Sequence, residues 1–234
     1  MQLPKIDLPI YEMILPSTGE KIKFRSFTVK EEKILLIAKE SKDSDQNMLA
    51  IKQILNNCLI DKKVEDLSIF DIEYLLLMIR GKSVNNTAEF IIVDPETSEE
   101  VKLKMIIDNV TINRDPRHSN KIQLNDEYIM FMKYPNIEMF KAFFDSEKIK
   151  DPLVYYDVMV SCIDKIVSEE NVYKFSDFSK EEIDNFMENL ESDVIERIKV
   201  FFETMPKLRH EIKYTNKNGN EKTFVIEGTD SFFI

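Results

Sequence analysis

The sequence predicts an α+β protein that is mostly helical and carries three β-hairpins, one N-terminal, one central and one C-terminal. Three observations lead to this fold class. Strand-like runs flank short turns that contain Pro, Gly or Asn, and amphipathic segments with capping residues lie between the hairpins. The predicted strands and helices do not alternate along the chain, so a doubly wound parallel sheet is not expected.

Each predicted hairpin joins two runs that partly alternate apolar and polar residues. Pro16 and Gly19 lie in the first turn, Pro95 fixes φ in the second, and Asn218-Gly219 supplies the positive φ values that a tight turn requires. The paired runs are Ile10–Leu15 with Lys21–Phe27, Ala88–Val93 with Glu100–Ile107, and Arg209–Tyr214 with Lys222–Glu227. Two further strands are expected at Asn109–Ile112 and Lys121–Leu124, on either side of a polar loop.

The helices are predicted from apolar residues at helical spacing and from capping residues. Thr28 with Glu31 and Ser179 with Glu182 have the spacing of capping boxes, which satisfy free N–H groups at a helix start. The first expected helix begins at Thr28. The later ones are expected at Gln46–Leu59, Ser68–Lys82, Asn136–Lys148, Pro152–Ser168, Ser179–Leu190 and Ser192–Thr204.

Three regions follow one another along the chain and are expected to form one compact unit. Residues 1–130 hold a hairpin, three helices and strands, residues 131–205 form a helical region, and residues 206–234 form the C-terminal hairpin and tail. Pro206 ends the last helix because proline lacks an N–H and clashes with the preceding turn. A chain of 234 residues can bury a substantial core.

The charge balance is acidic, with 43 acidic against 32 basic residues and a net charge of −11. This balance disfavours binding to nucleic acid or to an anionic membrane surface. We find no apolar run near the ~20 residues that cross a bilayer, and the N-terminus has no apolar signal core. Cys58 and Cys162 lie at helical core spacing, which predicts buried thiols in a cytosolic protein.

Candidate chemistry centres on the polar loop that carries His118 next to Arg114, Asp115 and Arg117. His118 could act as a general base or a metal ligand, or it could stabilise the loop or contact a partner. His210 is expected at a half-exposed strand position. No nucleophile motif, phosphate-binding loop or set of four zinc ligands is present. We therefore expect no catalytic residues, no metal and no cofactor.

Aromatic residues gather in the acidic region around the predicted later helices, and those that stay exposed would form a protein-binding patch. These residues are Phe140, Phe143, Phe144, Tyr155, Tyr156, Phe175, Phe178 and Phe186. The chain end provides a second candidate in Phe232, Phe233 and Ile234, which either dock on their own domain or insert into a partner.

Several sequence blocks occur in order over nearly the whole chain and together carry a family resemblance. They are Leu15–Gly19 with Phe27–Leu36, Ile51–Cys58, Phe70–Leu75 with Ile79–Val84, Met132–Pro135, Phe201–Leu208, and Glu227-Gly228 with Phe232-Phe233. In these blocks the chain resembles the T4-type bacteriophage baseplate hub family.

The resemblance implies a non-enzymatic structural or assembly protein of the central hub of a contractile tail baseplate. Its partners would be other hub or tail proteins, with self-association as a further option, and it would act in the host cytoplasm during assembly and in the virion tail baseplate. The expected contact residues are Arg114, Arg117, His118, Lys133, Tyr134, Pro135, Phe232, Phe233 and Ile234. The alternatives are a transient assembly chaperone that is absent from the mature virion, and a hydrolase that uses His118 with Asp115.

One departure from the family pattern concerns the hairpin turns, where relatives carry CxxC-like pairs suggestive of zinc knuckles. The corresponding turns here are Asp94–Ser98 and Asn216–Asn220, and neither contains cysteine. A metal site is therefore not carried over to this chain, and turn chemistry is expected to hold both hairpins.

Overall fold

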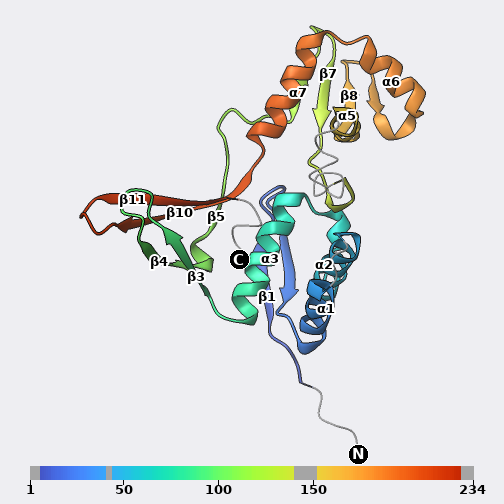
Figure 1. Cartoon of the computed structure of the whole chain (residues 1–234). Coiled ribbons are helices and arrows are strands. Elements are labelled where there is room, and N and C mark those ends of the chain that lie inside the picture. Colours follow the sequence, from blue (N-terminus) through green and yellow to red (C-terminus); the bar gives the residue numbers. More distant parts are fainter. Residues whose placement is uncertain (1–5, 41–43, 140–151, 228–234) are drawn as a thin grey trace, which may run out of the picture. The chain divides into compact units, whose positions relative to one another are not determined.

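The computed structural model describes residues 6–40, 44–139 and 152–227, and their contacts divide the chain into two units. The first unit joins the chain up to Asn113 with the chain from Pro206, and the second unit spans Arg114–Met205 (Figure 1). Helices account for 40% and strands for 30% of the structure, and the strands form four sheets. The fold is therefore mixed α+β, and the prediction of a mostly helical protein with three hairpins is wrong.

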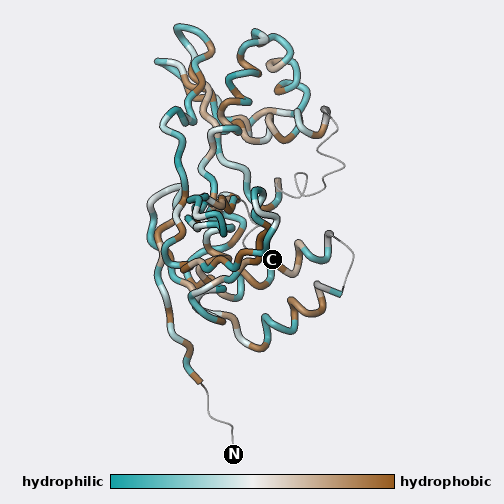
Figure 2. The backbone as a smooth tube through the Cα atoms, turned by 60° about the vertical axis from the view of Figure 1, so that its left-hand side comes forward, coloured by the Kyte–Doolittle hydropathy of each residue, from teal (hydrophilic) through white to brown (hydrophobic). Residues whose placement is uncertain are grey.

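The first unit begins with an antiparallel hairpin of β1 (Ile10–Ile14) and β2 (Lys21–Arg25), followed by three helices. The helices are α1 (Val29–Glu40), α2 (Ser44–Cys58) and, after the short turn η1 (Val64–Asp66), α3 (Ile69–Ser83). Hydrophilic and hydrophobic stretches alternate along these elements (Figure 2). The buried side chains include Leu15, Ile22, Phe24, Ile54, Leu55, Phe70, Leu75 and Ile79.

Two buried carboxylates fix helix starts in this unit. Glu31 accepts hydrogen bonds from the backbone N–H of Thr28 at 2.9 Å and from the Arg25 guanidinium at 3.0 and 3.1 Å. Burial alone would raise the pKa of Glu31, but these donors lower it to about 2. Asp71 accepts from the Ser68 hydroxyl at 2.6 Å and from the Ser17 N–H at 2.9 Å, which ties the first hairpin turn to α3.

The strands that complete the first unit come from both ends of the sequence. The central hairpin pairs β3 (Thr87–Val93) with β4 (Glu100–Ile106). Past the turn η2 (Ile107–Asn109), β5 (Thr111–Asn113) pairs with β10 (Lys207–Thr215), which also pairs with β11 (Glu221–Glu227). The C-terminal hairpin is thus an extension of a sheet of order β11-β10-β5.

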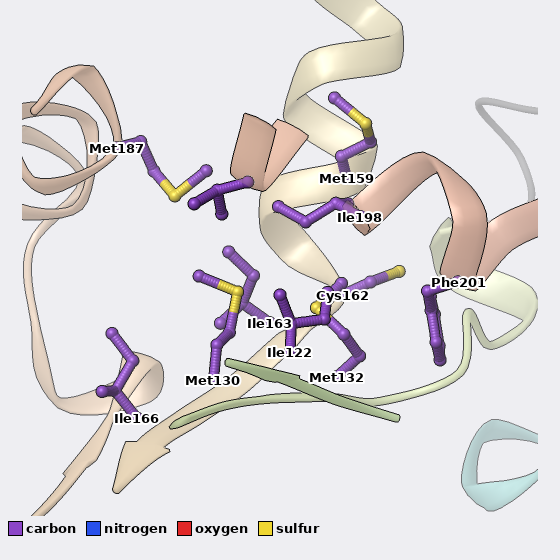
Figure 3. Packing of buried hydrophobic residues seen from close by; sticks show 11 residues of the cluster. Ile122, Met130, Met132, Met159, Cys162, Ile163, Ile166, Met187, Ile198 and Phe201 are labelled. Carbon is purple, nitrogen blue, oxygen red and sulfur yellow. The ribbon is translucent and has the colours of Figure 1, made fainter. Parts of the chain in front are cut away.

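The second unit is built on an antiparallel sheet of order β6-β7-β8-β9. Its strands are β6 (Lys121–Gln123), β7 (Ile129–Met132), β8 (Ile163–Val167) and β9 (Val172–Lys174), and its helices include α5 (Pro152–Ser161), α6 (Lys180–Glu188) and α7 (Ser192–Thr204). Figure 3 shows the core, in which strand residues such as Ile122 and Met130 pack with helix residues such as Met159 and Ile198.

The sheet of the second unit explains why the fold-class prediction is wrong. The expected helix Pro152–Ser168 ends at Ser161, and Ile163–Val167 forms a strand that pairs with β7 and β9. Ile163 and Ile166 are buried while Asp164 is exposed, so the β-branched residues gain more from a strand that covers the core than from a longer helix. The expected helix Asn136–Lys148 lies mostly outside the described residues. Among the described helices, none is both long and apolar enough to cross a membrane.

Candidate functional site

A groove of about 620 Å³ is formed in the second unit by the β6–β7 loop, β8, β9 and helices α6 and α7. The turn η3 (Phe175–Asp177), which leads from β9 into α6, also contributes. Apolar and aromatic side chains make up most of the lining. They are Leu124, Tyr128, Ile166, Tyr173, Phe175, Phe178, Ile183, Phe186, Leu190 and Val194.

Aromatic rings meet in this groove from elements that are separate in the sequence. Phe175 and Phe186 pack edge to face, with ring centroids 6.0 Å apart, and Tyr128 lies 6.5 Å from Tyr173. Phe178 is 41% exposed and Tyr173 is 37% exposed. Large aromatic side chains that are partly exposed in a groove are typical anchors of protein interfaces.

The start of α6 positions one wall of the groove. Ser179 caps the helix and forms a capping box with Glu182, whose carboxylate accepts from the Ser179 N–H at 2.8 Å and from its hydroxyl at 2.7 Å. Phe178 and Ile183 flank this cap in the positions of a hydrophobic staple, and both line the groove. The hydrogen bonds from Ser179 lower the pKa of Glu182, so a charged carboxylate lies in the groove wall.

The groove lies in the most acidic part of the chain. The two segments that form most of it, residues 124–128 and 166–194, hold eleven acidic and two basic residues. Their net charge of −9 accounts for most of the −11 of the whole chain. Glu182 and Glu191 line the groove. The Glu127 carboxylate accepts a hydrogen bond from the Tyr128 hydroxyl, and this bond raises the pKa of Tyr128. The apolar groove is therefore formed by segments with a large excess of acidic residues, which would attract cationic groups.

His118, the centre of the predicted polar loop, is held at both ring nitrogens. Nδ1 lies 2.9 Å from the Thr204 hydroxyl and Nε2 lies 2.9 Å from the Tyr134 hydroxyl. Because the Thr204 hydroxyl donates to the Val200 carbonyl at 2.6 Å, it accepts from Nδ1–H, which leaves Nε2 to accept from Tyr134. Burial lowers the pKa of His118 and favours this neutral ring.

The ring of His118 also packs against the core of the second unit. It stacks on Tyr134 with centroids 5.6 Å apart and lies 5.2 Å from the ring of Phe201, which is buried. Tyr134 and Phe201 stack on each other as well, at 5.6 Å. These contacts support the loop-stabilising interpretation of His118 rather than an interpretation as a free base.

Asp115 does not pair with the His118 ring as the hydrolase hypothesis requires. Its carboxylate binds Arg117 instead, at 2.7 Å from Nη2 and 3.0 Å from Nε. This guanidinium is the main reason that the pKa of Asp115 falls to about 2. In the part of the chain that the structure describes, both His118 nitrogens and the Asp115 carboxylate therefore have other partners.

The remaining predicted contact residues are spread over different environments. Lys133 is exposed and donates its backbone N–H to the Cys162 carbonyl at 2.7 Å, whereas Pro135 is buried and Arg114 is exposed. Phe232, Phe233 and Ile234 lie outside the described residues. The predicted contact residues of the polar loop and of Lys133–Pro135 do not line the groove. Their role as partner contacts stays a prediction.

Metal chemistry has no recognisable centre within the described ranges, where no group of three or more His, Cys, Asp or Glu side chains is arranged to hold an ion. Cys58 and Cys162 are both buried. Burial raises the pKa of Cys58 to about 11 and that of Cys162 to about 12, so both thiols stay protonated at neutral pH.

The two cysteine-free hairpin turns of the first unit lie against each other. The Glu96 carboxylate of the central turn accepts from Asn216 at 3.2 Å and Asn218 at 3.1 Å and forms a 2.6 Å ion pair with Lys222. The buried carboxylate of Asp94 accepts from the Tyr214 hydroxyl at 2.8 Å. We call these contacts between the central and C-terminal turns the turn clasp. They hold the two hairpins by hydrogen bonds and ion pairs.

Comparison with known families gives a match over nearly the whole chain. Residues 8–234 match the family described as T4 bacteriophage base plate protein. The chain belongs to this base plate protein family. A search of curated proteins and a search of solved structures each found no match. Family membership confirms the resemblance seen in the sequence and places the protein among those that contact other baseplate or tail proteins of a phage.

Sequence reasoning named the aromatic residues of this baseplate protein but missed the groove. Phe175, Phe178 and Phe186 were recognised as candidates for an exposed patch, whereas Tyr128 and Tyr173 were not. Tyr173 lies in the strand β9, which has only three residues. So short a segment shows no pattern that separates a strand from a loop. The acidic residues from 166 to 194 were visible in the sequence and could have marked the surface.

Proposed function

We propose that this baseplate protein is a non-enzymatic structural or assembly component of the central hub of a contractile tail, acting through protein–protein contacts. The observation that supports this best is the groove, which offers partly exposed aromatic anchors within a strongly acidic surface. The acidic charge would favour basic patches on partners and disfavour nucleic acid.

A catalytic role has little support from the described side chains. The His118 ring is held by Thr204 and Tyr134, and its pKa is lowered by burial. The groove contains carboxylates, but its wall residue Glu182 caps a helix. These contacts stabilise the fold, which supports a function in binding other proteins rather than in catalysis.

The test is to follow the protein through assembly. Quantitative mass spectrometry of purified virions and of isolated baseplate intermediates would measure how many copies each particle contains. A hub component is expected in both preparations at a fixed ratio to other baseplate proteins. Absence from both preparations would contradict the proposal, as would a position at the edge of the baseplate in a cryo-EM reconstruction.

The second candidate is an assembly chaperone that works in the host cytoplasm and leaves before the virion is complete. The open aromatic groove favours it, since a groove that binds an apolar segment suits temporary protection of a partner. The same measurement separates the two. The chaperone would be present in intermediates and absent from virions, whereas a structural component would be present in both.

A further inference from the structure

We propose that the groove of the second unit binds a segment of another phage protein in which large apolar side chains are flanked by Lys or Arg. This inference rests on the proposed function and names the surface and the partner chemistry through which it would work. Three observations support this inference: the aromatic anchors of the groove, the charge of the segments that form it, and the acidic character of this chain itself.

The anchors define the apolar part of the partner segment. Phe178 and Tyr173 present exposed ring surface, and the buried residues Ile166 and Val194 form part of the floor. Burial of apolar side chains against such rings supplies most of the affinity of a typical interface. The volume of about 620 Å³ lies within the range of sites that enclose a ligand or a few side chains.

The charge around the groove defines the flanks of the segment. Eleven acidic and two basic residues occupy the segments 124–128 and 166–194. Asp126 and Glu127 precede the lining residue Tyr128 in the β6–β7 loop. Glu182 and Glu191 lie in the lining itself. A segment with flanking Lys or Arg would be attracted by this field, whereas an acidic segment would be repelled.

The same charge argues against an occupant from this chain. A second copy would bring its own net charge of −11 to the groove. The apolar segment Phe232-Phe233-Ile234 follows the acidic residues Glu227 and Asp230. Charge complementarity therefore favours a different, basic protein over self-association at this surface.

The experiment uses 15-residue peptides that tile the baseplate and tail proteins of the same phage, together with residues 220–234 of this chain. The purified full chain is probed against this array, and the affinity of each bound peptide is measured by fluorescence polarisation. The expected bound peptides share two or more large apolar residues with at least two nearby Lys or Arg. Binding is expected to weaken more than tenfold between 0.05 and 0.5 M NaCl because screening reduces the attraction.

Two substitutions with matched controls locate the site. Phe178→Asp is expected to weaken binding more than tenfold, whereas Val200→Asp, at a 46% exposed position of α7 outside the groove, leaves it within twofold. Glu191 caps α7 without a side-chain hydrogen bond, so Glu191→Lys tests charge without loss of a cap. Glu191→Lys is expected to weaken binding about threefold or more. Its matched control is Glu203→Lys, which makes the same charge change near the other end of α7.

Each contrary outcome has a defined meaning. The inference is overturned if no peptide binds, if the bound peptides are acidic, if residues 220–234 bind best, or if Phe178→Asp and Val200→Asp behave alike. The proposed function is judged separately, by whether the wild-type chain enters baseplates. If wild-type and Phe178→Asp proteins enter baseplates equally, the groove inference fails and the proposed function stands. If the wild-type chain never enters one, the proposed function itself fails.

Discussion

Glu96 Oε1 accepts a hydrogen bond of 2.7 Å from Nδ2 of Asn220, although 124 residues separate the two in the sequence. The same carboxylate pairs with Lys222 at 2.6 Å, so one acidic side chain joins the turn of the central hairpin to the C-terminal hairpin. Contacts between such distant residues must offset the entropy of closing a long loop. The turn clasp is therefore expected to contribute measurably to the stability of the first unit.

Glu96→Gln should lower the thermal midpoint of the first unit by a few degrees at pH 7, because a neutral amide cannot form the ion pair with Lys222. The Lys222 hydrogen bond is the main reason that the pKa of Glu96 is lowered to about 2. Because the folded pKa of Glu96 lies below the ordinary glutamate value of 4.5, the stabilisation is full above about pH 4.5 and is lost as the pH falls towards 2. Circular dichroism melts from pH 7 to pH 2.5 would therefore show a shallower acid decline in the variant.

The control for this prediction is Glu100→Gln, which removes an exposed carboxylate from the same hairpin. Its acid profile is expected to follow that of the wild type. Parallel acid profiles for Glu96→Gln and the wild type would show that the turn clasp does not depend on the Glu96 charge.

The turns of the first two hairpins share one geometry, although the fifth turn residue is glycine in the first and serine in the second. In both, the fifth turn residue donates its N–H to the first residue's carbonyl at 2.8 Å, from Gly19 to Leu15 and from Ser98 to Asp94. Gly19 has φ 74° and Ser98 has φ 58°, a region that costs a non-glycine residue about 1 kcal/mol. Ser98→Gly removes this cost, but glycine loses more chain entropy on folding, which offsets about half of the gain. A net stabilisation of roughly 0.5 kcal/mol is therefore expected in urea unfolding.

Gly19→Ser is the reciprocal change and should destabilise the protein by about 0.5 kcal/mol, because the strain cost of about 1 kcal/mol is partly offset by the smaller entropy loss of serine on folding. A Cβ at Gly19 would meet no atom within 4 Å, so no steric clash adds to the balance of backbone strain and chain entropy. Equal stabilities for the wild type and both variants would mean that the positive φ carries no cost in these turns.

His118→Ala should destabilise the second unit by about 2 kcal/mol at pH 7.5, because it removes two hydrogen bonds and the stacking on Tyr134 and Phe201. Burial lowers the pKa of His118, so its folded pKa lies below the ordinary histidine value of 6.5. Its stabilising contribution is then full above about pH 6.5 and is lost as the pH falls through the folded pKa.

Thermal unfolding followed between pH 7.5 and pH 5 would test this directly. The wild type is expected to lose stability over this range, and His118→Ala is expected to lose less. His210→Ala is the control, since burial also lowers the pKa of His210 but that residue lies in the first unit. A wild-type level of stability in His118→Ala at pH 7.5 would contradict a structural role for the ring.

Gly81→Ala is expected to destabilise the protein although alanine favours helices. Gly81 lies within α3, and a Cβ there would meet Cγ2 of the buried Ile107 at 3.0 Å. Overpacking costs about 1–3 kcal/mol, while the helix propensity gain is about 1 kcal/mol, so a net loss near 1 kcal/mol is expected in urea unfolding. Ile107→Leu removes that branch at Cβ and should restore part of the loss in the double variant. Additive effects of the two changes would argue against the close contact.

Local turn and capping chemistry allowed much of the fold to be predicted. The hairpin turns at Gly19, Pro95 and Gly219 depend on residues next to each other, and the capping box at Ser179 spans four residues. The strand Ile163–Val167 was missed because its apolar spacing also fits the helix that precedes it. Only pairing with β7 and β9 decides between the two, and pairing partners cannot be read from a single segment.

The candidate site was less predictable for the same physical reason. The groove combines a loop, two strands, a turn and two helices, so its aromatic residues meet only when the sheet has formed. The Gly81 position shows a similar limit, because the space that it leaves for Ile107 depends on a contact between residues distant in the sequence. Residue type indicated where function could lie, and tertiary contacts decide which residues share a surface.

The most direct test of the account is complementation of a phage that lacks this gene with three variants: Phe178→Asp, Val200→Asp and His118→Gln. Plaque counts, with the level of folded protein in each infected cell, would be measured at a temperature at which all three variants fold. We expect that Phe178→Asp fails to support infection, while Val200→Asp and His118→Gln support it at near wild-type levels. Loss of infection with folded His118→Gln, together with normal infection with Phe178→Asp, would contradict it.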